Sequence, residues 1–260
     1  MAPANPFDLS GKRALIAGAS RGIGQAIAEG MARAGAHVVA AARSLPALEE
    51  IAGRLRGEGL QAVAVELDIS SRESRQRAVD TAGDVDILVN VAGMNLRKRF
   101  TEYTPEEYER LLRTNLTGIF ELTQAVGRGM IDRGRGGKVV MIGSLTSMLG
   151  LPYVTVYTVT KAALAGLTRS LAAEWGGHNI QVNCIAPGFI LTDLNREMWK
   201  PPHMTGWLQG VQPNPRMGRP DDIAPLAVFL GGPGSDYITG QVIAVDGGLS
   251  TTTMWPFQPA

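Results

Sequence analysis

The feature that most limits how this chain can fold is an alternation of short apolar runs with longer segments of helical periodicity. The apolar runs are rich in β-branched residues and lie at 13–17, 37–42, 61–67, 86–91, 138–142, 181–185 and 241–245. The helical segments fall between them at 23–34, 45–56, 72–82, 105–130 and 154–175. Strands that are apolar on both faces and joined through helices form parallel sheets covered on both sides. The sequence therefore predicts an α/β fold, a doubly wound parallel sheet of about seven strands with helices on both faces.

The composition limits the classes of partner. Lys plus Arg number 25 against 24 Asp plus Glu, and a net charge of +1 leaves no basic excess for a phosphate backbone. We therefore expect no nucleic-acid partner. The first residues lack the basic and apolar regions of a signal peptide, and no stretch approaches the roughly 18 apolar residues of a membrane span. We expect a cytoplasmic protein that does not enter a membrane.

Cysteine and histidine are too few to build a framework. Cys184 is the single cysteine, so no internal disulfide can form. His37, His178 and His203 are scattered and lack the spacing of metal ligands. We therefore expect neither a disulfide scaffold nor a metal site.

Nothing in the sequence divides the 260 residues into separate units, because no Gly/Ser-rich or charge-rich linker is present. We expect one domain spanning 1–260. The stretch 189–219 interrupts the alternation with four prolines. We interpret it as a substrate lid, with a surface insertion that does not touch substrate as the alternative. The tail 250–260 is apolar for a free end, so we expect it to pack on a neighbouring subunit, with fraying as the alternative.

A glycine-rich turn joins the first strand to the first helix. It consists of Gly18, Ala19, Ser20, Arg21, Gly22, Ile23 and Gly24. Glycine lets the backbone approach a pyrophosphate, and the helix N-terminus offers unpaired N–H groups at its positive end. The spacing is Gly-x-x-x-Gly-x-Gly instead of the usual Gly-x-Gly-x-x-Gly, and a turn without a ligand is the alternative. No Gly-Lys-Ser/Thr follows, which excludes a nucleoside triphosphatase loop. We predict a dinucleotide site in a single-domain, Rossmann-type fold.

The end of the second strand distinguishes the two nicotinamide dinucleotides. A carboxylate there would bind the ribose hydroxyls of NAD, whereas a basic residue would accept the 2′-phosphate of NADP. The strand is followed by Arg43 with no acid near it, and Arg21 in the glycine turn offers a second cation. We favour NADP(H) as the cofactor. If Arg43 only stacks on adenine, NAD(H) is used as well.

Two further strand ends are expected at the same edge of the sheet. Asp68, followed by Ile69, closes the third strand and is placed to accept a hydrogen bond from the adenine amino group. A plain helix N-cap is the alternative for Asp68. Asn90, Ala92 and Gly93 follow the fourth strand and predict a backbone platform under the nucleotide ribose.

Three polar residues follow the fifth strand and open the next helix: Ser144, Tyr157 and Lys161. Tyr157 and Lys161 are four residues apart, which places both side chains on one face of a helix. A free tyrosine has a pKa near 10, and we expect the adjacent ammonium to lower it enough for Tyr157 to exchange a proton. Ser144 can hold a carbonyl or carbinol oxygen as charge develops on it. A hydride donor or acceptor would complete an oxidation or reduction.

The order of these motifs resembles the short-chain dehydrogenase/reductase family from Leu9 to about Leu249. The resemblance is carried by Gly18-x-x-x-Gly22-x-Gly24, Asn90-Val-Ala-Gly93, Asn115, Ser144, Tyr157-x-x-x-Lys161, Pro187-Gly188 with Thr192, and Asp246-Gly247-Gly248. It implies an NAD(P)-dependent oxidoreductase. It also implies a homo-oligomer joined through 105–130, 154–175 and the last strand; we expect a homotetramer, with a dimer as the alternative.

The resemblance implies a role for each matched residue. Tyr157 would give or take the proton, and Ser144 would hold the substrate oxygen. Lys161 would bind the nicotinamide ribose and tune Tyr157, while Asn115 would sustain a water-linked proton relay. The residues expected to line the nicotinamide are Pro187, Gly188, Ile190 and Thr192.

The loop after the fourth strand gives the hypothesis about the substrate. The segment 93–100 and the region around Trp207 are similar to sugar-acid dehydrogenases of that family, of the gluconate 5-dehydrogenase type. Of the cations at 97–99, at least one is expected to be only solvated, and Arg97 is the candidate to pair with a substrate carboxylate. Leu149, His203 and Trp207 are further candidate substrate contacts. A 3-oxoacyl-carrier reductase and a non-catalytic NADP(H) sensor are the alternatives.

Two departures from the family pattern occur together. The family usually has Thr before the first glycine and a second Asn in the fourth-strand motif, where this chain has Ala17 and Val91. Our hypothesis is that an apolar contact between these two side chains replaces a polar tie between strands one and four.

Overall fold

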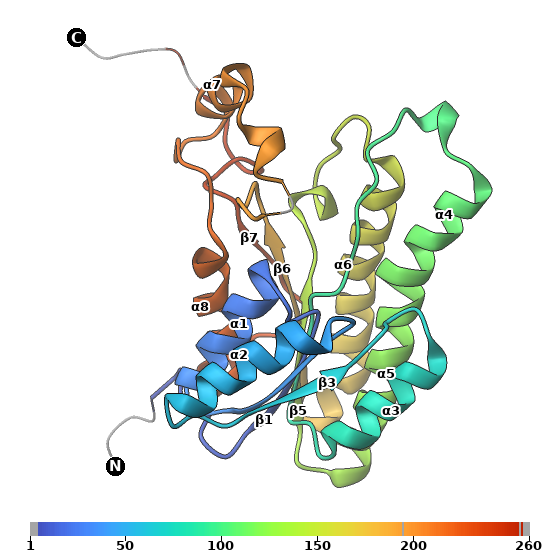
Figure 1. The fold of residues 1–260 in the computed structure, drawn as a ribbon, viewed down its shortest axis with the longest axis vertical. Coiled ribbons are helices and arrows are strands. Elements are labelled where there is room, and N and C mark those ends of the chain that lie inside the picture. Colours follow the sequence, from blue (N-terminus) through green and yellow to red (C-terminus); the bar gives the residue numbers. More distant parts are fainter. Residues whose placement is uncertain (1–4, 194, 255, 257–260) are drawn as a thin grey trace.

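Seven parallel strands form one sheet in the order β3-β2-β1-β4-β5-β6-β7 (Figure 1). This is a computed structural model, and it describes residues 5–193, 195–254 and 256. The strand bounds are β1 Arg13–Ala17, β2 His37–Ala42, β3 Ala62–Glu66, β4 Ile87–Asn90, β5 Gly137–Ile142, β6 Ile180–Pro187 and β7 Val242–Val245. Strand order reverses between β1 and β4, and ligands of such sheets bind at the carboxyl ends beside that point.

Helices cover both faces of the sheet. On one face α1 (Gly22–Arg33), α2 (Leu45–Gly57) and α8 (Pro220–Gly231) contribute to a single apolar cluster with the sheet. On the other face α3 (Arg72–Ala82), α5 (Gly118–Arg133) and α6 (Thr155–Trp175) contribute to a second cluster. Figure 1 shows α1, α2 and α8 on one side and α3, α5 and α6 on the other. The predicted doubly wound α/β fold is therefore confirmed, because strands buried on both faces need two helical layers.

The expected helix over 105–130 is two helices in the structure. α4 (Pro105–Leu112) and α5 are separated by one π-helical segment, Arg113–Thr117. A π-turn inserts one extra residue per turn and commonly marks a functional site. Periodicity alone did not reveal it, because the apolar pattern continues through the insertion.

The stretch 189–219 carries its own structure. It contains a short 3₁₀ turn, Glu197–Trp199, and α7 (Pro202–Val211), neither of which the sequence analysis predicted. Phe189 packs edge-on against Trp199 and Trp207, with ring centroids 5.0 and 5.5 Å apart. Figure 1 shows α7 at the end of the molecule beyond the sheet. α8 also was not expected, and Pro220 and Pro225 within it explain why a sequence pattern misses it.

The hypothesis about Ala17 and Val91 is wrong as stated. The backbones are joined, because the N–H groups of Val91 and Ala92 donate to the Ala17 carbonyl at 2.8 and 2.7 Å. The side chains, however, belong to the two different apolar clusters. Main-chain hydrogen bonds, not an apolar side-chain contact, therefore hold the ends of β1 and β4 together.

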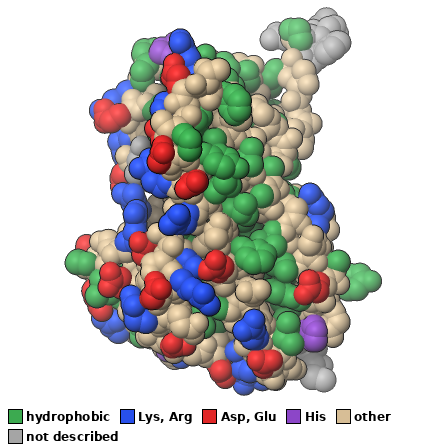
Figure 2. Space-filling model, turned by 90° about the vertical axis from the view of Figure 1, so that its right-hand side faces the viewer, with side chains coloured by type: hydrophobic (Ala, Val, Ile, Leu, Met, Phe, Trp, Pro, Cys, Tyr) green, Lys and Arg blue, Asp and Glu red, His purple; other side chains and the backbone are tan. Residues whose placement is uncertain are grey.

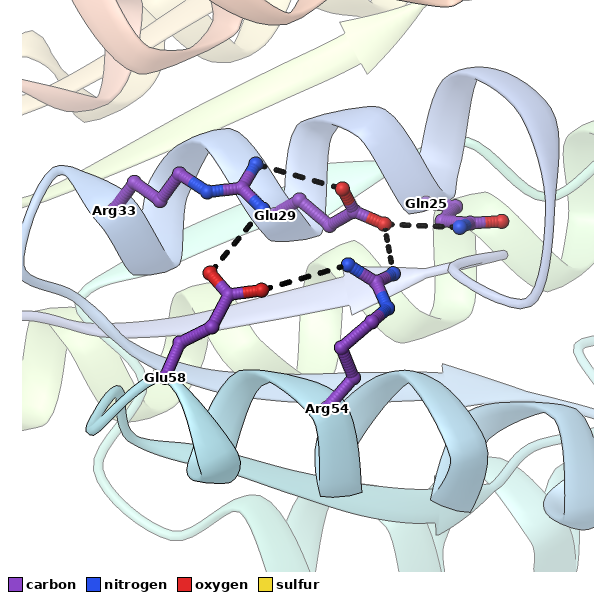
Figure 3. Close-up of polar contacts among 5 residues, drawn as sticks. All are labelled: Gln25, Glu29, Arg33, Arg54 and Glu58. Carbon is purple, nitrogen blue, oxygen red and sulfur yellow. Dashed lines mark hydrogen bonds and ion pairs between the residues drawn. The ribbon is translucent and has the colours of Figure 1, made fainter.

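A polar network ties α2 to α1 on the protein surface (Figure 3). Glu29 accepts hydrogen bonds from Arg54 at 2.5 Å and from Gln25 at 2.9 Å. Arg33 bridges Glu29 and Glu58 at 3.5 and 3.3 Å. Exposed ion pairs contribute at most about 1 kcal/mol each, but a network shared by two helices fixes their relative position. α1 begins in the glycine turn and α2 begins just after Arg43, so the network links two parts of the predicted cofactor site.

The structure was searched for a membrane-spanning helix and for a metal site, neither of which the sequence analysis expected. Within residues 5–193, 195–254 and 256, no helix is long and apolar enough to cross a membrane. Over the same residues, no group of three or more His, Cys, Asp or Glu side chains could hold a metal ion.

Candidate active site

The glycine turn packs closely against the N-terminus of α1 and the end of β4. Gly18 and Gly22 have φ of +103° and +55°, which side-chain-bearing residues rarely adopt. A Cβ on Gly24 would lie 2.0 Å from the Gly18 carbonyl oxygen, so only glycine allows the helix to pack this closely. Arg21 precedes α1 without forming a side-chain cap, and the first turn holds no acid. The unpaired N–H groups of this turn therefore suit a pyrophosphate.

The segment after β6 approaches the same turn. A Cβ placed on Gly22 would lie 3.4 Å from the Thr192 methyl carbon, and one on Gly188 would lie 2.6 Å from the Asp246 Cα. Pro187 ends β6, and Ile190 is buried and forms a parallel bridge with Gly218. The structure thus brings the predicted nicotinamide segment, 187–192, against the predicted pyrophosphate turn.

The residues predicted at the adenosine end lie where β2 and β3 finish. Arg43 is exposed, and within the described residues it forms no hydrogen bond or ion pair. Asp68 accepts hydrogen bonds from the Ser70 N–H and hydroxyl at 2.9 and 2.7 Å. These bonds, with the charge of Arg43, lower the pKa of Asp68. Ser71, not Asp68, caps α3, so the helix-cap alternative is wrong. The side chain of Ile69 is buried in the apolar core.

The residues after β4 contribute mainly backbone. The Asn90 side chain is fully buried and donates to the Thr123 hydroxyl at 2.9 Å, so it faces the core. A Cβ on Gly93 would lie 3.6 Å from the Lys161 ammonium nitrogen. Gly93 therefore brings main chain beside Lys161, and the platform under the ribose stays a prediction.

Asn115 lies in the π-helical segment and is fully buried. Its side-chain oxygen accepts from the Met94 N–H and its side-chain nitrogen donates to the Met94 carbonyl, both at 2.8 Å. The same nitrogen donates to the Thr160 hydroxyl at 3.3 Å. The Asn115 amide thus fixes the start of the 94–99 loop against α6. Both N–H donors of the Asn115 side chain are therefore used, and its oxygen keeps one acceptor position.

Ser144, Tyr157 and Lys161 meet where β5 ends beside α6. The Lys161 ammonium lies 5.6 Å from the centroid of the Tyr157 ring and donates to the Ile142 carbonyl at 2.7 Å. Ser144 follows β5, and its hydroxyl oxygen accepts from the Thr146 N–H at 3.2 Å. That leaves the Ser144 hydroxyl hydrogen free to be donated to another oxygen. The three predicted residues are therefore together.

The expectation that Lys161 lowers the pKa of Tyr157 is wrong for the polypeptide itself. Burial raises the pKa of Tyr157, and the Ser144 hydroxyl and the positive charge of Arg97 only oppose this rise. Burial also lowers the pKa of Lys161 from 10.5 to about 8. Removing a charged group from water disfavours its ionised form, and at Tyr157 that effect exceeds the opposing effects of Ser144 and Arg97. The site as it stands keeps the phenol protonated.

Of the predicted substrate residues, Arg97 is the one whose effect on the site is visible. Lys98 pairs with Glu107 at 2.9 Å, and Arg99 lies 3.7 Å from Glu102. Arg97 forms no ion pair within the described residues, and its charge acts on Tyr157. Two of the three adjacent cations therefore form ion pairs, whereas the sequence analysis expected at least one of them to be only solvated.

The other predicted substrate residues lie farther out on loops and on α7. Leu149 is partly buried and follows the Ser144 turn. His203 is exposed on α7, and Trp207 is 44% exposed with its edge against Phe189. No contact in the described residues joins these two side chains to Tyr157.

Ser147 joins two parts of the site and was not among the predicted residues. Its hydroxyl oxygen accepts from the Ser144 N–H at 3.2 Å and donates to the Lys161 carbonyl at 2.9 Å. The signal in the sequence was a second polar side chain three residues after Ser144, the spacing of reciprocal capping, although Ser stands here in place of the usual Glu or Gln.

Comparison with known proteins agrees with this geometry. The profile of a family described as "Enoyl-(Acyl carrier protein) reductase" matches residues 18–250. The chain belongs to the short-chain dehydrogenase/reductase family. As a member of this family it is an NAD(P)-dependent oxidoreductase, and the resemblance inferred from its motifs is confirmed.

Relatives within the short-chain dehydrogenase/reductase family match nearly the whole chain. Gluconate 5-dehydrogenase of Gluconobacter oxydans (strain 621H) is 38% identical over 95% of this chain and 97% of its own length. A 3-oxoacyl-[acyl-carrier-protein] reductase of Pseudomonas aeruginosa is 39% identical over 94% of this chain and 99% of its own. The crystal structure of a gluconate 5-dehydrogenase from Burkholderia cenocepacia J2315 in complex with NADP and tartrate has a TM-score of 0.91. It is 38% identical and covers 95% of this chain and 98% of that one.

Proposed function

We propose that this enzyme transfers a hydride between NADP(H) and a secondary alcohol or ketone of a sugar acid, of the gluconate or ketogluconate type. The observation that carries the proposal is Arg97, the one cation of 97–99 without an ion pair in the described residues, whose charge acts on Tyr157. A guanidinium beside the proton-transfer residue suits a substrate with a carboxylate. Relatives named gluconate 5-dehydrogenase support the same substrate class.

The residues present fit a dinucleotide phosphate. Gly18 and Gly22 have positive φ, and a side chain on Gly18 or Gly24 would collide with neighbouring backbone, so only glycine allows the tight turn that brings the N-terminus of α1 to a pyrophosphate. Arg43 and Arg21 would hold the 2′-phosphate, with Asp68 and Ile69 at the adenine. Ser20 and Ile23 belong to the turn around the pyrophosphate. Ala92, Gly93 and the 187–192 segment would hold the ribose and nicotinamide. When bound, NADP(H) supplies or accepts the hydride.

Proton transfer is assigned to the residues at the end of β5 and on α6. The Ser144 hydroxyl donates to the substrate oxygen, which directs that oxygen toward Tyr157. Because the pKa of Tyr157 is raised, the phenol is protonated at neutral pH and donates its proton to a carbonyl that is being reduced. Lys161 would bind the nicotinamide ribose through its ammonium, which lies 5.6 Å from the centroid of the Tyr157 ring. Asn115 fixes Met94 and thereby the loop that carries Arg97.

Replacing Arg97 with Ala tests the substrate class. We expect kcat/KM for gluconate or 5-ketogluconate to fall about 10- to 100-fold, mainly through KM, because one charge-assisted pair with the carboxylate is lost. Turnover of an uncharged ketone should change less than threefold. The measurement is NADPH absorbance over a panel of sugar acids, keto acids, simple ketones and 3-oxoacyl thioesters.

The neighbouring Arg99→Ala variant is the matched control, because Arg99 is exposed and lies near Glu102. An equal loss in both variants would show that net charge, not a specific contact, is responsible. Turnover of acyl thioesters alone would instead favour the 3-oxoacyl reductase, which the 39% identical relative supports. A protein that binds NADPH but turns over nothing would be a sensor.

Assembly into a homotetramer is part of the proposal. A groove of about 290 Å³ runs between α5 and α6 and is lined in part by Phe120, Leu167 and Leu171. Phe120 and, on α6, Val159 are almost half exposed. Figure 2 shows apolar side chains gathered on the side of the molecule that carries α4 and α5. Contiguous exposed apolar surface is typical of subunit interfaces. Light scattering should give the mass of four chains, whereas a monomer at micromolar concentration would refute this.

The 189–219 stretch is proposed as the substrate lid, with Trp207 and His203 on α7 and Leu149 as a further substrate contact. Part of the tail, including Trp255 and residues 257–260, lies outside the described residues, so its packing on a neighbour stays a prediction.

A cytoplasmic location is proposed because the single thiol, Cys184, is buried and unpaired and NADP(H) is an intracellular cofactor. Cell fractionation would test the location.

A further inference from the structure

The residues that flank Ser144 in the chain are hydrogen-bonded to Lys161 on α6. Two residues before it, the Ile142 carbonyl accepts a hydrogen bond from the Lys161 ammonium at 2.7 Å. Three residues after it, the Ser147 hydroxyl donates to the Lys161 carbonyl at 2.9 Å and accepts from the Ser144 N–H at 3.2 Å. Lys161 therefore forms hydrogen bonds to the chain both before and after Ser144, at Ile142 and at Ser147.

The hydrogen bond to Ile142 and the bridge through Ser147 use different groups of Lys161. The bond to Ile142 occupies the Lys161 ammonium, which the proposed function needs for the nicotinamide ribose. The Ser147 bridge uses only the backbone N–H of Ser144 and the backbone carbonyl of Lys161. It therefore leaves the Ser144 hydroxyl and the Lys161 ammonium free for chemistry.

The Ser147 hydroxyl is closely packed against the main chain of Gly143. A Cβ on Gly143 would lie 2.7 Å from the Ser147 hydroxyl oxygen, so the hydroxyl sits directly against the main chain at the end of β5. The turn 145–147 is a short 3₁₀ helix with reciprocal caps between Ser144 and Ser147. Such a turn makes few hydrogen bonds of its own, so a side-chain tie to α6 sets its position.

We propose that Ser147 is a positioning residue that holds Ser144 in register with Tyr157 and Lys161 through its bridge between β5 and α6. This rests on the proposed function. Ser147 does not touch the reacting atoms; its hydroxyl fixes the distance between the strand end that carries Ser144 and the helix that carries the proton donor.

The test compares Ser147→Ala with Ser147→Thr, which keeps the hydroxyl, and with Ser170→Ala at an exposed serine on α6. For Ser147→Ala we expect kcat to fall about 10- to 100-fold, because small misplacements of reacting groups cost up to about 10²-fold. NADPH affinity, measured by fluorescence, should stay within twofold, and substrate KM should change less than kcat. The alkaline limb of the pH profile should move to higher pH, because the Ser144 hydroxyl would no longer oppose the raised pKa of Tyr157.

A readout independent of activity is hydrogen exchange at the Ser144 amide. It should speed up at least tenfold in Ser147→Ala and remain slow in Ser147→Thr and Ser170→Ala. Equal activity in Ser147→Ala and the parent protein would overturn the proposal, as would an unchanged Ser144 amide or an equal loss in Ser147→Thr.

The two proposals fail in different ways. If the parent enzyme reduces only acyl thioesters, the sugar-acid function fails, and the same three variants are assayed on thioesters. If the parent turns over nothing, the proposed function fails and the Ser144 amide alone decides whether Ser147 holds that residue.

Discussion

Tyr157→Phe is expected to lower kcat by about 10³-fold in both directions while NADPH binding stays within twofold. The substitution removes only the hydroxyl, so the proton donor is lost while the ring keeps its packing against Lys161. General acid–base catalysis by one side chain contributes about 10²- to 10⁴-fold. The measurement is steady-state turnover together with fluorescence titration of NADPH.

The pH dependence of alcohol oxidation is a second test of the role of Tyr157. Alcohol oxidation requires the phenolate, and burial raises the pKa of Tyr157, so oxidation by the parent enzyme should rise with pH through the alkaline range. The residual oxidation by Tyr157→Phe should lack that rise. Tyr237→Phe, at a fully exposed tyrosine, is the control and should behave as the parent. Retained turnover in Tyr157→Phe would remove this residue from the mechanism.

Arg43→Asp is expected to change the preference for NADP over NAD by about 10²- to 10³-fold in favour of NAD. Arg43 is exposed at the end of β2 with no ion pair among the described residues. Losing a charge-assisted bond to the 2′-phosphate costs about 1.5–3 kcal/mol, and the new carboxylate repels that phosphate. The measurement is kcat/KM for each cofactor at a saturating level of the same substrate.

Arg77→Asp is the matched control for Arg43→Asp. It makes the same change in net charge at an exposed position on α3, away from the end of β2. We expect its cofactor preference to stay within twofold of the parent. An unchanged preference in Arg43→Asp would mean that Arg43 only stacks on adenine or contributes nothing, and Arg21 would then be the remaining cation of the glycine turn.

Much of the candidate site follows from local sequence. The strand ends at Ala17 and Ile142 could be placed, and that of β4 to within one residue, because an apolar run followed by glycine or polar residues marks where a buried strand leaves the sheet. The spacing of Tyr157 and Lys161 also sufficed to place both on one helix face. The positive φ of Gly18 and Gly22 agrees with the interpretation of the turn.

Other features depend on groups far apart in the chain. Which cation of 97–99 lacks a partner depends on Glu102 and Glu107, whose positions follow from where α4 begins. The π-helical segment forms where Asn115 bonds to Met94, 21 residues away. The Ser147 bridge exists only because β5 and α6 pack side by side.

The sequence by itself determined the alternation of strands and helices, the glycine turn and the set of chemical groups in the site, since these depend on side-chain period and on backbone freedom within a few residues. Only the tertiary structure decided the direction of the pKa shift at Tyr157 and the surroundings of Arg97. The reason is physical: the ionisation of a buried group depends on how much water it has lost and on the charges that other segments bring near it. The spacing of residues along the chain determines neither the loss of water nor the nearby charges.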